Sequence, residues 1–425
     1  MELMRARGTR DFLPEQKLVR DWIMQVLKKN FERYGYRPLE TPVLERFDVL
    51  ASKYTGGAEI LKETFSLKDQ GDRDLALRYD LTVPMCRVIA MNPNLRLPFK
   101  RYQMDKVFRD GPVEKGRVRE FYQCDVDIVG VSSMLADAEV LALSVDVMKD
   151  LGLNVVMKVN NRKVLDAVLD AAGVVKDKSD VLLTIDKLYK IQRRGVEAEL
   201  KEKGLSADAV AMILDCLTMR GANEEKIKQL RAVVKNQDGL DELEQLFAFA
   251  KNFGVKPFFD PSLARGLTYY TGTIFEIVLL DKDIGSIGGG GRYDTMIGNL
   301  VGSGSYPAMG ISFGLDRIYD VLIESGRKFP LTPVEVFVIP IKTLDASLEI
   351  VKELRLSGVN VDMDMLGKAI SKNLDYANKL QIPFVVIVGD DEVKQKKVKL
   401  KNMVSGEECL VTVADAVEKI KVITK

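Results

Sequence analysis

The chain has 425 residues, a formal net charge of +1 and a hydrophobic share of 46%. This length predicts two or three domains, and the composition excludes a disordered, collagenous or coiled-coil protein. The four cysteines lie far apart with no Cys-x-x-Cys pair, which argues against a disulfide framework and a cysteine zinc site. No apolar run approaches the roughly 18 residues of a membrane span, and the N-terminus has no apolar signal core. We therefore expect a cytoplasmic protein without a membrane partner.

The sequence contains no histidine. Its absence excludes a Ser-His-Asp triad, a His-Glu-x-x-His zinc site and any imidazole acid or base. Catalysis must therefore rest on carboxylates, arginines, lysines, tyrosines, backbone dipoles or a bound metal. The nearly neutral charge balance neither indicates nor excludes a nucleic-acid partner, because a basic patch can be local.

The first part of the chain combines helices with short strands. Apolar residues at helical spacing predict a helix over 15–34, and the next ten residues are interpreted as an extended edge segment interrupted by two prolines. Strand-like runs with turn signals follow between about 64 and 130. A further helix is expected over 132–152, with a serine cap at its start and Gly152 as its stop.

The remainder of the chain divides into a helical stretch, a strand-rich stretch and a stretch in which strands and helices alternate. Residues of about 162–255 show helical periodicity with glycine endings, which predicts a helical insertion between two strand-rich halves. Strands return from about 256. The segment 326–333 has the composition of a linker, and the alternation of strands and helices over 334–425 predicts a separate α/β domain with a mostly parallel sheet.

The first candidate site is the segment FRDGPVEKGRVREFYQCDVD, where a Gly/Pro loop separates two strand-like runs. Arg109 and Arg117 on a rigid hairpin can hold phosphate oxygens, and Phe121 offers a stacking surface for a base. A solvated hairpin tip is the alternative interpretation of this loop.

Two further stretches carry acidic and amide side chains. Gln123, Asp125 and Asp127 alternate along one strand face, which suits a polar ligand. In ALRYDLTVP, Asp80 and Thr82 are expected to share one face, although an aspartate before an apolar strand is more often a turn or cap residue.

The stretch ARGLTYYTGTIFE places Arg265 before a tyrosine pair. Adjacent tyrosines on a strand face opposite sides, so we expect one of Tyr269 and Tyr270 in the core and the other in a cleft. A purely structural role fits the composition equally well.

A glycine run and a later arginine form the last candidate site. Residues 288–291 are all glycine and allow a ligand to approach the backbone closely, but they match neither a P-loop nor a Rossmann fingerprint. Arg317 falls at the start of a helix, where it either reaches a phosphate or lies on the surface. The lysine-rich segment 393–401 could bind RNA phosphates if it is a strand, with a lysine-protected sheet edge as the favoured alternative.

Together, these segments resemble the histidyl-tRNA synthetase family of the class II aminoacyl-tRNA synthetases. ERYGYRPLETPVLERFDVL, KRYQMDKVFRDGPVEKGRVREFYQCDVDIVG and GISFGLDRI are similar to the three class motifs. LARGLTYYTGTIFE and GGGGRYD are similar to signatures of the histidine enzymes in particular.

The resemblance implies both a fold and a reaction. The fold would be a catalytic domain over 1–325 with an antiparallel six-stranded sheet and the helical insertion, then the linker and an anticodon-binding domain over 334–425. Histidine and ATP, with Mg²⁺, would give histidyl-adenylate and pyrophosphate, and the histidyl group would pass to the 3′ end of tRNA(His). A homodimer is implied by the first motif.

The resemblance also implies roles for single residues, with no protein metal site. Arg109 and Arg265 would be the catalytic pair at the α-phosphate, and ATP would also be held by Arg117, Phe121 and Arg317. Thr268 stands where the family usually has an aspartate. The histidine-binding residues would be Asp80, Leu81, Thr82, Arg109, Gln123, Asp127, Arg265, Tyr269 and Tyr270.

Three other functions were weighed. A regulatory subunit of ATP phosphoribosyltransferase would generally lack Arg265 and the C-terminal domain, both of which this chain has. Another class II synthetase, for threonine or proline, is disfavoured by the tyrosine pair and by the absence of cysteine and histidine metal ligands. A purely structural RNA-binding protein would not need Arg109, Arg265 and Arg317 together.

Overall fold

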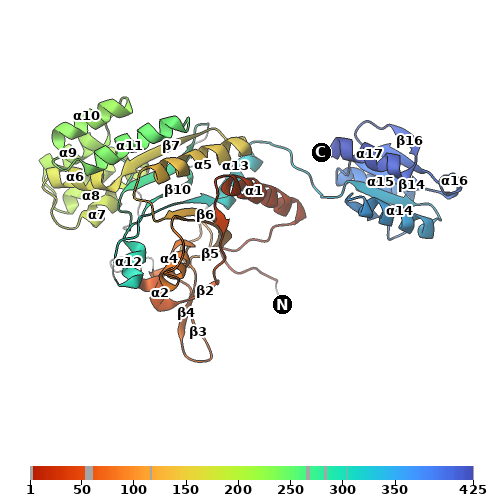
Figure 1. The fold of residues 1–425 in the computed structure, drawn as a ribbon, viewed down its shortest axis with the longest axis horizontal. Helices are drawn as coiled ribbons and strands as arrows, with labels where there is room; N and C mark the ends of the chain where they lie inside the picture. Colours follow the sequence, from red (N-terminus) through yellow and green to blue (C-terminus); the bar gives the residue numbers. More distant parts are fainter. Residues whose placement is uncertain are drawn as a thin grey trace. The chain divides into compact units, whose positions relative to one another are not determined.

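The structure is a computed structural model that describes residues 3–52, 61–114, 117–264, 269–281, 285–302 and 304–424 (Figure 1). The chain divides into two compact units. The larger unit contains residues 1–10 and 23–325, and the smaller unit contains residues 11–22 and 326–425. Among the described residues, no helix is both long and apolar enough to cross a membrane.

The larger unit is built on an eight-stranded sheet with the strand order β1-β5-β6-β11-β10-β9-β7-β8. Its inner six strands, from β5 to β7, pair in antiparallel fashion, whereas β1 and β8 pair in parallel with their neighbours. The strands are β1 (Arg37–Pro38), β5 (Phe99–Phe108), β6 (Glu120–Val129), β7 (Val155–Asn161), β8 (Phe258–Phe259), β9 (Thr273–Leu279), β10 (Ser286–Arg292) and β11 (Ala308–Gly314).

The expected six-stranded antiparallel sheet is therefore only the inner part of a mixed eight-stranded sheet. The two added strands are two residues long and lie at the edges, and one of them contains Pro38. An edge is the place where a strand can accept proline, because the missing N–H would otherwise interrupt a hydrogen-bond ladder. Strand β7 was not predicted at all.

A small antiparallel sheet, β2-β4-β3, accompanies the large one; its strands are β2 (Leu44–Arg46), β3 (Ser66–Lys68) and β4 (Asp74–Leu77). After β4 we expected the chain to continue as an apolar strand, but it forms a helix from Thr82. The helices outside the insertion are α1 (Pro14–Arg33), α2 (Phe47–Ser52), α4 (Thr82–Met91), α5 (Leu135–Leu151), α12 (Met296–Val301) and α13 (Leu315–Glu324).

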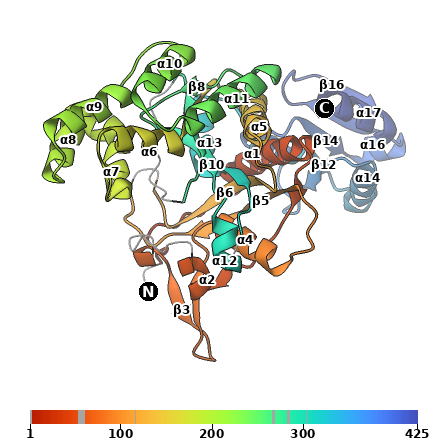
Figure 2. The same cartoon turned by 60° about the vertical axis from the view of Figure 1, so that its left-hand side comes forward.

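The predicted helical insertion contains six helices. They are α6 (Arg162–Ala171), α7 (Lys178–Ile185), α8 (Leu188–Glu202), α9 (Ala207–Leu217), α10 (Asn223–Val233) and α11 (Asp238–Asn252). Helices α6 to α10 form a group at one side of the larger unit, and α11 runs back to pack on α5 (Figure 2). Helices α7 and α10 were not distinguished from the sequence.

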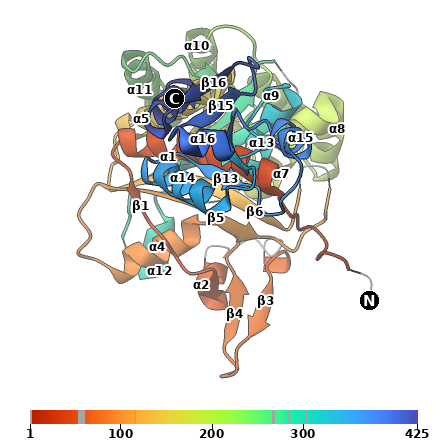
Figure 3. The same ribbon diagram turned by 90° about the vertical axis from the view of Figure 1, so that its right-hand side faces the viewer.

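The smaller unit has a five-stranded sheet with the order β13-β12-β14-β15-β16 (Figure 3). Strands β12, β13 and β14 are parallel, whereas β15 and β16 are antiparallel, so the sheet is mixed and not mostly parallel as expected. The elements are β12 (Val336–Pro340), α14 (Leu344–Leu356), β13 (Val361–Met363), α15 (Ile370–Lys379), β14 (Phe384–Val388), α16 (Asp390–Lys394), β15 (Val398–Asn402), β16 (Glu408–Val411) and α17 (Val413–Thr424).

Both faces of this smaller sheet are covered. Val336 and Val338 pack into one apolar cluster, whereas Phe337 and Ile339, which alternate with them on β12, pack into another. This alternation is the pattern of a strand buried on both sides. Only residues 398–401 of the lysine-rich segment belong to a strand, β15, and this strand does not lie at an edge, because β16 pairs with it. Lys401 forms an ion pair with Glu408 at 2.8 Å.

Two glycines of the run on β10 are explained by contacts within the protein. A Cβ atom on Gly290 would lie 1.9 Å from the carbonyl oxygen of Gly310 on β11. A Cβ atom on Gly291 would lie 2.5 Å from the carbonyl oxygen of Thr273 and 2.8 Å from the Tyr270 ring. These glycines therefore permit strands and a tyrosine to pack closely, and no ligand is needed to account for them.

We predict that Gly290→Ala lowers the free energy of unfolding of the larger unit by about 3 kcal/mol, because the new methyl group forces β10 and β11 apart. Urea denaturation followed by circular dichroism measures this loss. Gly71→Ala is the control, because the nearest atom to its Cβ would be a side-chain oxygen at 3.3 Å. Equal midpoints for the two variants would contradict the prediction.

Candidate functional site

A buried ion pair lies at the centre of the candidate site. The register of β5 and β6 places Arg101 opposite Asp127, and the Arg101 Nη2 and Asp127 Oδ2 atoms are 2.7 Å apart. Arg101 is fully buried and also donates to the carbonyl oxygen of Leu81 at 3.2 Å. The guanidinium thus joins the middle of the hairpin to the segment before α4.

The second oxygen of Asp127 joins this pair to the tyrosines. Tyr293, from the GGGGRYD segment, donates its hydroxyl to Asp127 Oδ1. Burial, and then the charge of Asp127, raise the pKa of Tyr293 well above its usual value, so the hydroxyl keeps its proton and remains a donor. A Cβ atom on Gly310 would lie 2.0 Å from the same carboxylate oxygen, so only glycine leaves room for Asp127 here.

The tyrosine pair stands next to Tyr293. The ring centroids of Tyr269 and Tyr293 are 6.3 Å apart in an edge-on arrangement, and those of Tyr269 and Tyr270 are 4.6 Å apart. The two adjacent tyrosines therefore do not point to opposite sides of a strand, as we expected. They precede β9 in a turn, where the alternation of a strand does not apply.

Asp80 is held at the N-terminus of α4. Its Oδ1 atom accepts hydrogen bonds from the backbone N–H groups of Thr82 at 3.1 Å and Val83 at 2.9 Å. Asp80 and Thr82 therefore meet through a helix start and not through one strand face. The aspartate serves as a cap, and the cap places residues 80–82 beside the Arg101 guanidinium.

Gln123 and Asp125 line the same face of β6 as Asp127. The Gln123 Nε2 atom donates to Ser312 Oγ at 3.0 Å. Within the part of the chain that the structure describes, the buried Gln123 Oε1 and Asp125 Oδ1 atoms have no hydrogen-bond partner. Unpaired buried acceptors are costly, so a pair of them at one place is the signature of a site completed by a ligand or water.

The Asp125 carboxyl group titrates abnormally. Its pKa is raised from 3.8 to about 7, chiefly by burial and also by the charges of Asp127 and Asp80, while Arg101 and a hydrogen bond from Ser312 oppose the shift. This face of β6 therefore carries one buried carboxyl group that can hold a proton near neutral pH beside one that is tied to an arginine.

The open end of the hairpin carries Arg109 between two aromatic rings. Its guanidinium carbon lies 4.3 Å from the Tyr79 ring centroid and 5.0 Å from that of Phe121. The Nε atom makes a long hydrogen bond, 3.4 Å, to the carbonyl oxygen of Tyr79. Arg109 is only half-buried, so stacking orients the guanidinium while most of its N–H groups stay available to an anion.

The other expected phosphate-binding arginines occupy separate places. The Arg117 Nη2 atom lies 3.8 Å from Glu63 Oε1 near the hairpin tip. Arg317, at the start of α13, is exposed and donates to the carbonyl oxygen of Ser286. The neighbouring Asp316 accepts the backbone N–H of Tyr122 at 3.2 Å, which holds the start of α13 beside β6. Arg265 and Thr268 lie outside the described residues.

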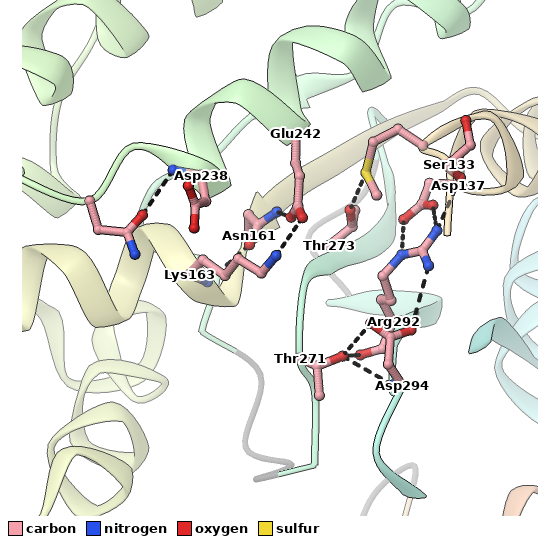
Figure 4. A network of polar contacts seen from close by, with 12 residues as sticks. Ser133, Asp137, Asn161, Lys163, Asp238, Glu242, Thr271, Thr273, Arg292 and Asp294 are labelled. Carbon is pink, nitrogen blue, oxygen red and sulfur yellow. Dashed lines mark hydrogen bonds and ion pairs between the residues drawn. The ribbon is translucent and has the colours of Figure 1, made fainter. Parts of the chain in front are cut away.

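A polar network joins Arg292 at the end of β10 to Asp137 on α5, and Thr271 before β9 to Asp294 (Figure 4). Arg292 forms a buried ion pair with Asp137 and donates to the carbonyl oxygen of Ser133 at 3.2 Å. Thr271 donates to Asp294 Oδ2 at 3.1 Å and accepts the backbone N–H of the same residue at 3.0 Å. The segment that precedes β9 and the segment that follows β10 are thereby tied together.

Several members of the site were missed by sequence reasoning. Arg101, Tyr293, Ser312 and Gly310 all contact the predicted residues, and none of them was selected. Tyr293 lies inside the quoted GGGGRYD signature, so its signal was present. Arg101 also lies inside a quoted motif, KRYQMDKVFRDGPVEKGRVREFYQCDVDIVG, but only the strand register shows that it faces Asp127.

The described residues include no group of three or more histidine, cysteine, aspartate or glutamate side chains arranged to hold a metal ion. A Mg²⁺ ion is commonly bound by substrate phosphates with only one or two protein carboxylates. We therefore assign no reaction step to protein-bound metal.

An antiparallel sheet with an arginine-bearing hairpin and a polar pocket, followed by an α/β unit, is the arrangement of a class II aminoacyl-tRNA synthetase. A family model described as histidyl-tRNA synthetase matches residues 8–318, and one described as anticodon binding domain matches residues 335–423. The chain belongs to the histidyl-tRNA synthetase family, which confirms the resemblance found in its sequence.

Individual relatives agree with this assignment. The Bacillus cereus protein "Histidine--tRNA ligase 1" is 45% identical over 424 residues, covering 97% of this chain and 98% of that protein. "Histidine--tRNA ligase" of Cytophaga hutchinsonii is 37% identical, covering 97% and 98%. The crystal structure of histidyl-tRNA synthetase from Nostoc sp. matches with a TM-score of 0.87 and 33% identity, covering 99% of both chains.

The raised pKa of Asp125 predicts a pH-dependent stability. Between its usual pKa of 3.8 and the folded value of about 7, the folded protein keeps a proton that the unfolded chain has released, so stability falls as the pH rises through this window. We expect the stability of Asp125→Asn not to show this fall, because the asparagine side chain does not titrate.

The measurement is urea denaturation of both proteins at pH 5 and pH 8. From pH 5 to pH 8, the free energy of unfolding of the wild type should fall by on the order of 2 kcal/mol more than that of Asp125→Asn. The control variant is Asp208→Asn, because Asp208 is exposed on α9. Its free energy of unfolding should fall from pH 5 to pH 8 by the same amount as that of the wild type. A constant difference between Asp125→Asn and the wild type would refute the prediction.

Proposed function

We propose that this protein is a histidine–tRNA ligase that forms histidyl-adenylate from L-histidine and ATP and transfers the histidyl group to the 3′ end of tRNA(His). The observation that carries the proposal is the arrangement along β6. Phe121, Gln123, Asp125 and Asp127 alternate on this strand, so a stacking surface with an arginine at one end and a buried acidic pocket at the other share one face. A nucleotide and a small cationic substrate can therefore meet on one strand.

The acidic pocket fits histidine. We assign Asp80, Leu81 and Thr82 to the amino-acid ammonium group and its surroundings, because they are held beside the Arg101–Asp127 pair. Tyr269 and Tyr270 would frame the imidazole. The remaining assigned residues are Gln123 and Asp127, with Arg109 and Arg265 at the carboxylate. Hydrogen bonds from buried polar groups to the imidazole can reject analogues that lack them by about 10⁴-fold, so no editing domain is required.

The adenylation step needs stabilised negative charge and no protein base. An oxygen of the histidine carboxylate attacks the α-phosphorus of ATP, its new bond to phosphorus forms, and the bond to the pyrophosphate oxygen breaks. Negative charge builds up on the α-phosphoryl oxygens, and Arg109, oriented by Tyr79 and Phe121, is placed to stabilise it, with Arg265 as its proposed partner. A chain without histidine loses nothing in this chemistry.

The other ATP contacts follow from the same assignment. Phe121 would stack on adenine, while Arg117 and Arg317 would bind the β- and γ-phosphates. Mg²⁺ would arrive with the nucleotide, neutralising phosphate charge as it does in other phosphoryl-transfer enzymes.

The smaller unit would bind the anticodon of the tRNA. Its support is the anticodon-binding family model over residues 335–423.

We also propose a cytoplasmic homodimer, in which the segment containing Pro42 contributes to the interface. The domain limits that we propose are 1–325, 326–333 and 334–425, for the catalytic domain, linker and anticodon-binding domain. The full-length similarity to named ligases and the presence of this C-terminal domain favour the ligase over a regulatory subunit of ATP phosphoribosyltransferase.

ATP–pyrophosphate exchange with the purified protein and each of the twenty amino acids tests the proposal. Exchange with histidine alone is the expected result, and charging of tRNA(His) should follow. Exchange with a different amino acid would refute the specificity, and histidine binding without exchange would favour the regulatory alternative.

We predict that Arg109→Ala lowers kcat of histidine-dependent exchange by about 10²–10³-fold, because it removes a preorganised donor to the α-phosphoryl oxygens. Folding should be preserved, since the guanidinium is half-buried and makes one long hydrogen bond. Arg46→Ala is the control, because Arg46 forms a surface ion pair with Asp48 away from the hairpin. Equal kcat values for the two variants would rule out the role assigned to Arg109.

A further inference from the structure

The N-terminal segment makes a tight turn against the start of β6. The Thr9 N–H group donates to the carbonyl oxygen of Ala6 at 3.2 Å, and the Thr9 hydroxyl donates to the same oxygen at 2.8 Å. Gly8 has a φ of +81°, the left-handed conformation required at the third position of such a turn and favourable only for glycine.

The Gly8 carbonyl oxygen then receives two hydrogen bonds from the hairpin. The backbone N–H of Arg119 donates to it at 2.8 Å and that of Glu120 at 3.4 Å. The N-terminal turn therefore pairs with the residues that immediately precede Phe121. These bonds are not part of the ladder between β5 and β6, whose register begins at Glu120.

Arg119 connects this turn to the rest of the hairpin tip. Its carbonyl oxygen accepts the backbone N–H of Arg109 at 2.9 Å, and its Nε atom donates to the carbonyl oxygen of Gly111 at 3.2 Å. Its Nη2 atom lies 3.1 Å from Asp110 Oδ1. One residue thus touches both limbs of the hairpin and the loop between them.

No side chain fits on Gly8 beside Arg119. A Cβ atom there would lie 2.7 Å from Arg119 Cγ, 2.9 Å from its Cβ and 3.0 Å from its Cδ. These distances are shorter than normal carbon contacts, so the stem of Arg119 would have to move, and its contacts with Asp110, Gly111 and Arg109 would move with it.

We propose that the Ala6–Thr9 turn is a positioning element of the nucleotide site, and that Gly8 acts through Arg119 to hold Arg109 and Phe121 in place. This role rests on the proposed ATP site in the β5–β6 hairpin. Gly8 is a positioning residue, because it touches the arginine framework and not the reacting groups.

The test compares Gly8→Ala with Gly35→Ala in the full-length protein. Gly35 has a φ of +79°, almost the same as Gly8, but nothing lies within 4 Å of its Cβ position. Both variants carry the same backbone strain, and only Gly8→Ala collides with Arg119. In histidine-dependent exchange we expect Gly8→Ala to raise KM for ATP about tenfold and KM for histidine by a smaller factor, while Gly35→Ala changes neither. Equal KM values for ATP in the two variants would overturn the proposal.

A double-mutant cycle with Arg119→Ala tests whether Gly8 acts through Arg119. Removal of Arg119 Cγ and Cδ relieves two of the three close contacts. Gly8→Ala added to Arg119→Ala should then change KM for ATP by no more than about twofold, because effects that share one pathway are not additive. A full additional tenfold increase would overturn the proposal.

Failure of the proposed function can be told apart from failure of this inference. If the wild type shows no histidine-dependent exchange, the proposed function fails, and calorimetric Kd values for ATP are compared for the wild type, Gly8→Ala and Gly35→Ala. Weaker ATP binding in Gly8→Ala alone supports the positioning role, and equal binding in all three proteins refutes it. Deletion of residues 1–9 is a second variant that should also weaken ATP binding if Gly8→Ala does not fold.

Discussion

The buried ion pair between Arg101 and Asp127 is the contact on which the candidate site depends. Transfer of both charges out of water is costly, and the cost is offset only when the geometry is good and the remaining lone pairs are satisfied. Here the carboxylate accepts the Tyr293 hydroxyl and pairs with Arg101, and the guanidinium also donates to the carbonyl oxygen of Leu81. Among the described residues, the buried Nε and Nη1 atoms of Arg101 have no hydrogen-bond partner, so the pair is only partly satisfied by the protein. Removal of one partner from such a pair typically costs about 3–5 kcal/mol. The pair therefore holds three distant segments of the chain in one arrangement.

The hairpin of β5 and β6 carries the two groups of candidate site residues at its two ends. Its buried end contributes the acidic floor, and its open end presents Arg109 between Tyr79 and Phe121. Because both ends belong to one pair of hydrogen-bonded strands, the distance between them does not depend on flexible loops. A reaction that joins a carboxylate to a phosphate requires such a fixed separation, since proximity and orientation supply much of the rate enhancement.

The absence of histidine is consistent with the chemistry that the site can perform. Arginine keeps its charge at all physiological pH values, and the attacking group in adenylate formation is the substrate carboxylate itself. Titration near neutral pH is instead provided by Asp125, whose pKa is raised to about 7, chiefly by burial. The protein thus has a group that titrates near neutral pH without an imidazole.

The sequence by itself determined most of the longer helices, the helical insertion, the linker composition and the family, because periodicity, glycine stops and motif order are local properties. The family signatures also identified most of the proposed site residues. The sequence could not show that Arg101 faces Asp127, because a pairing across 26 positions depends on strand register. The sequence favoured a turn or cap role for Asp80, which the structure confirms, but it did not show that a helix follows. It also could not show that the tyrosine rings lie together in a turn, or that two short parallel strands extend the inner sheet. Only the tertiary structure decided the strand pairings, since they join segments that are remote in the chain, whereas the Asp80 hydrogen bonds and the tyrosine pair are local features whose backbone conformation the sequence pattern left open.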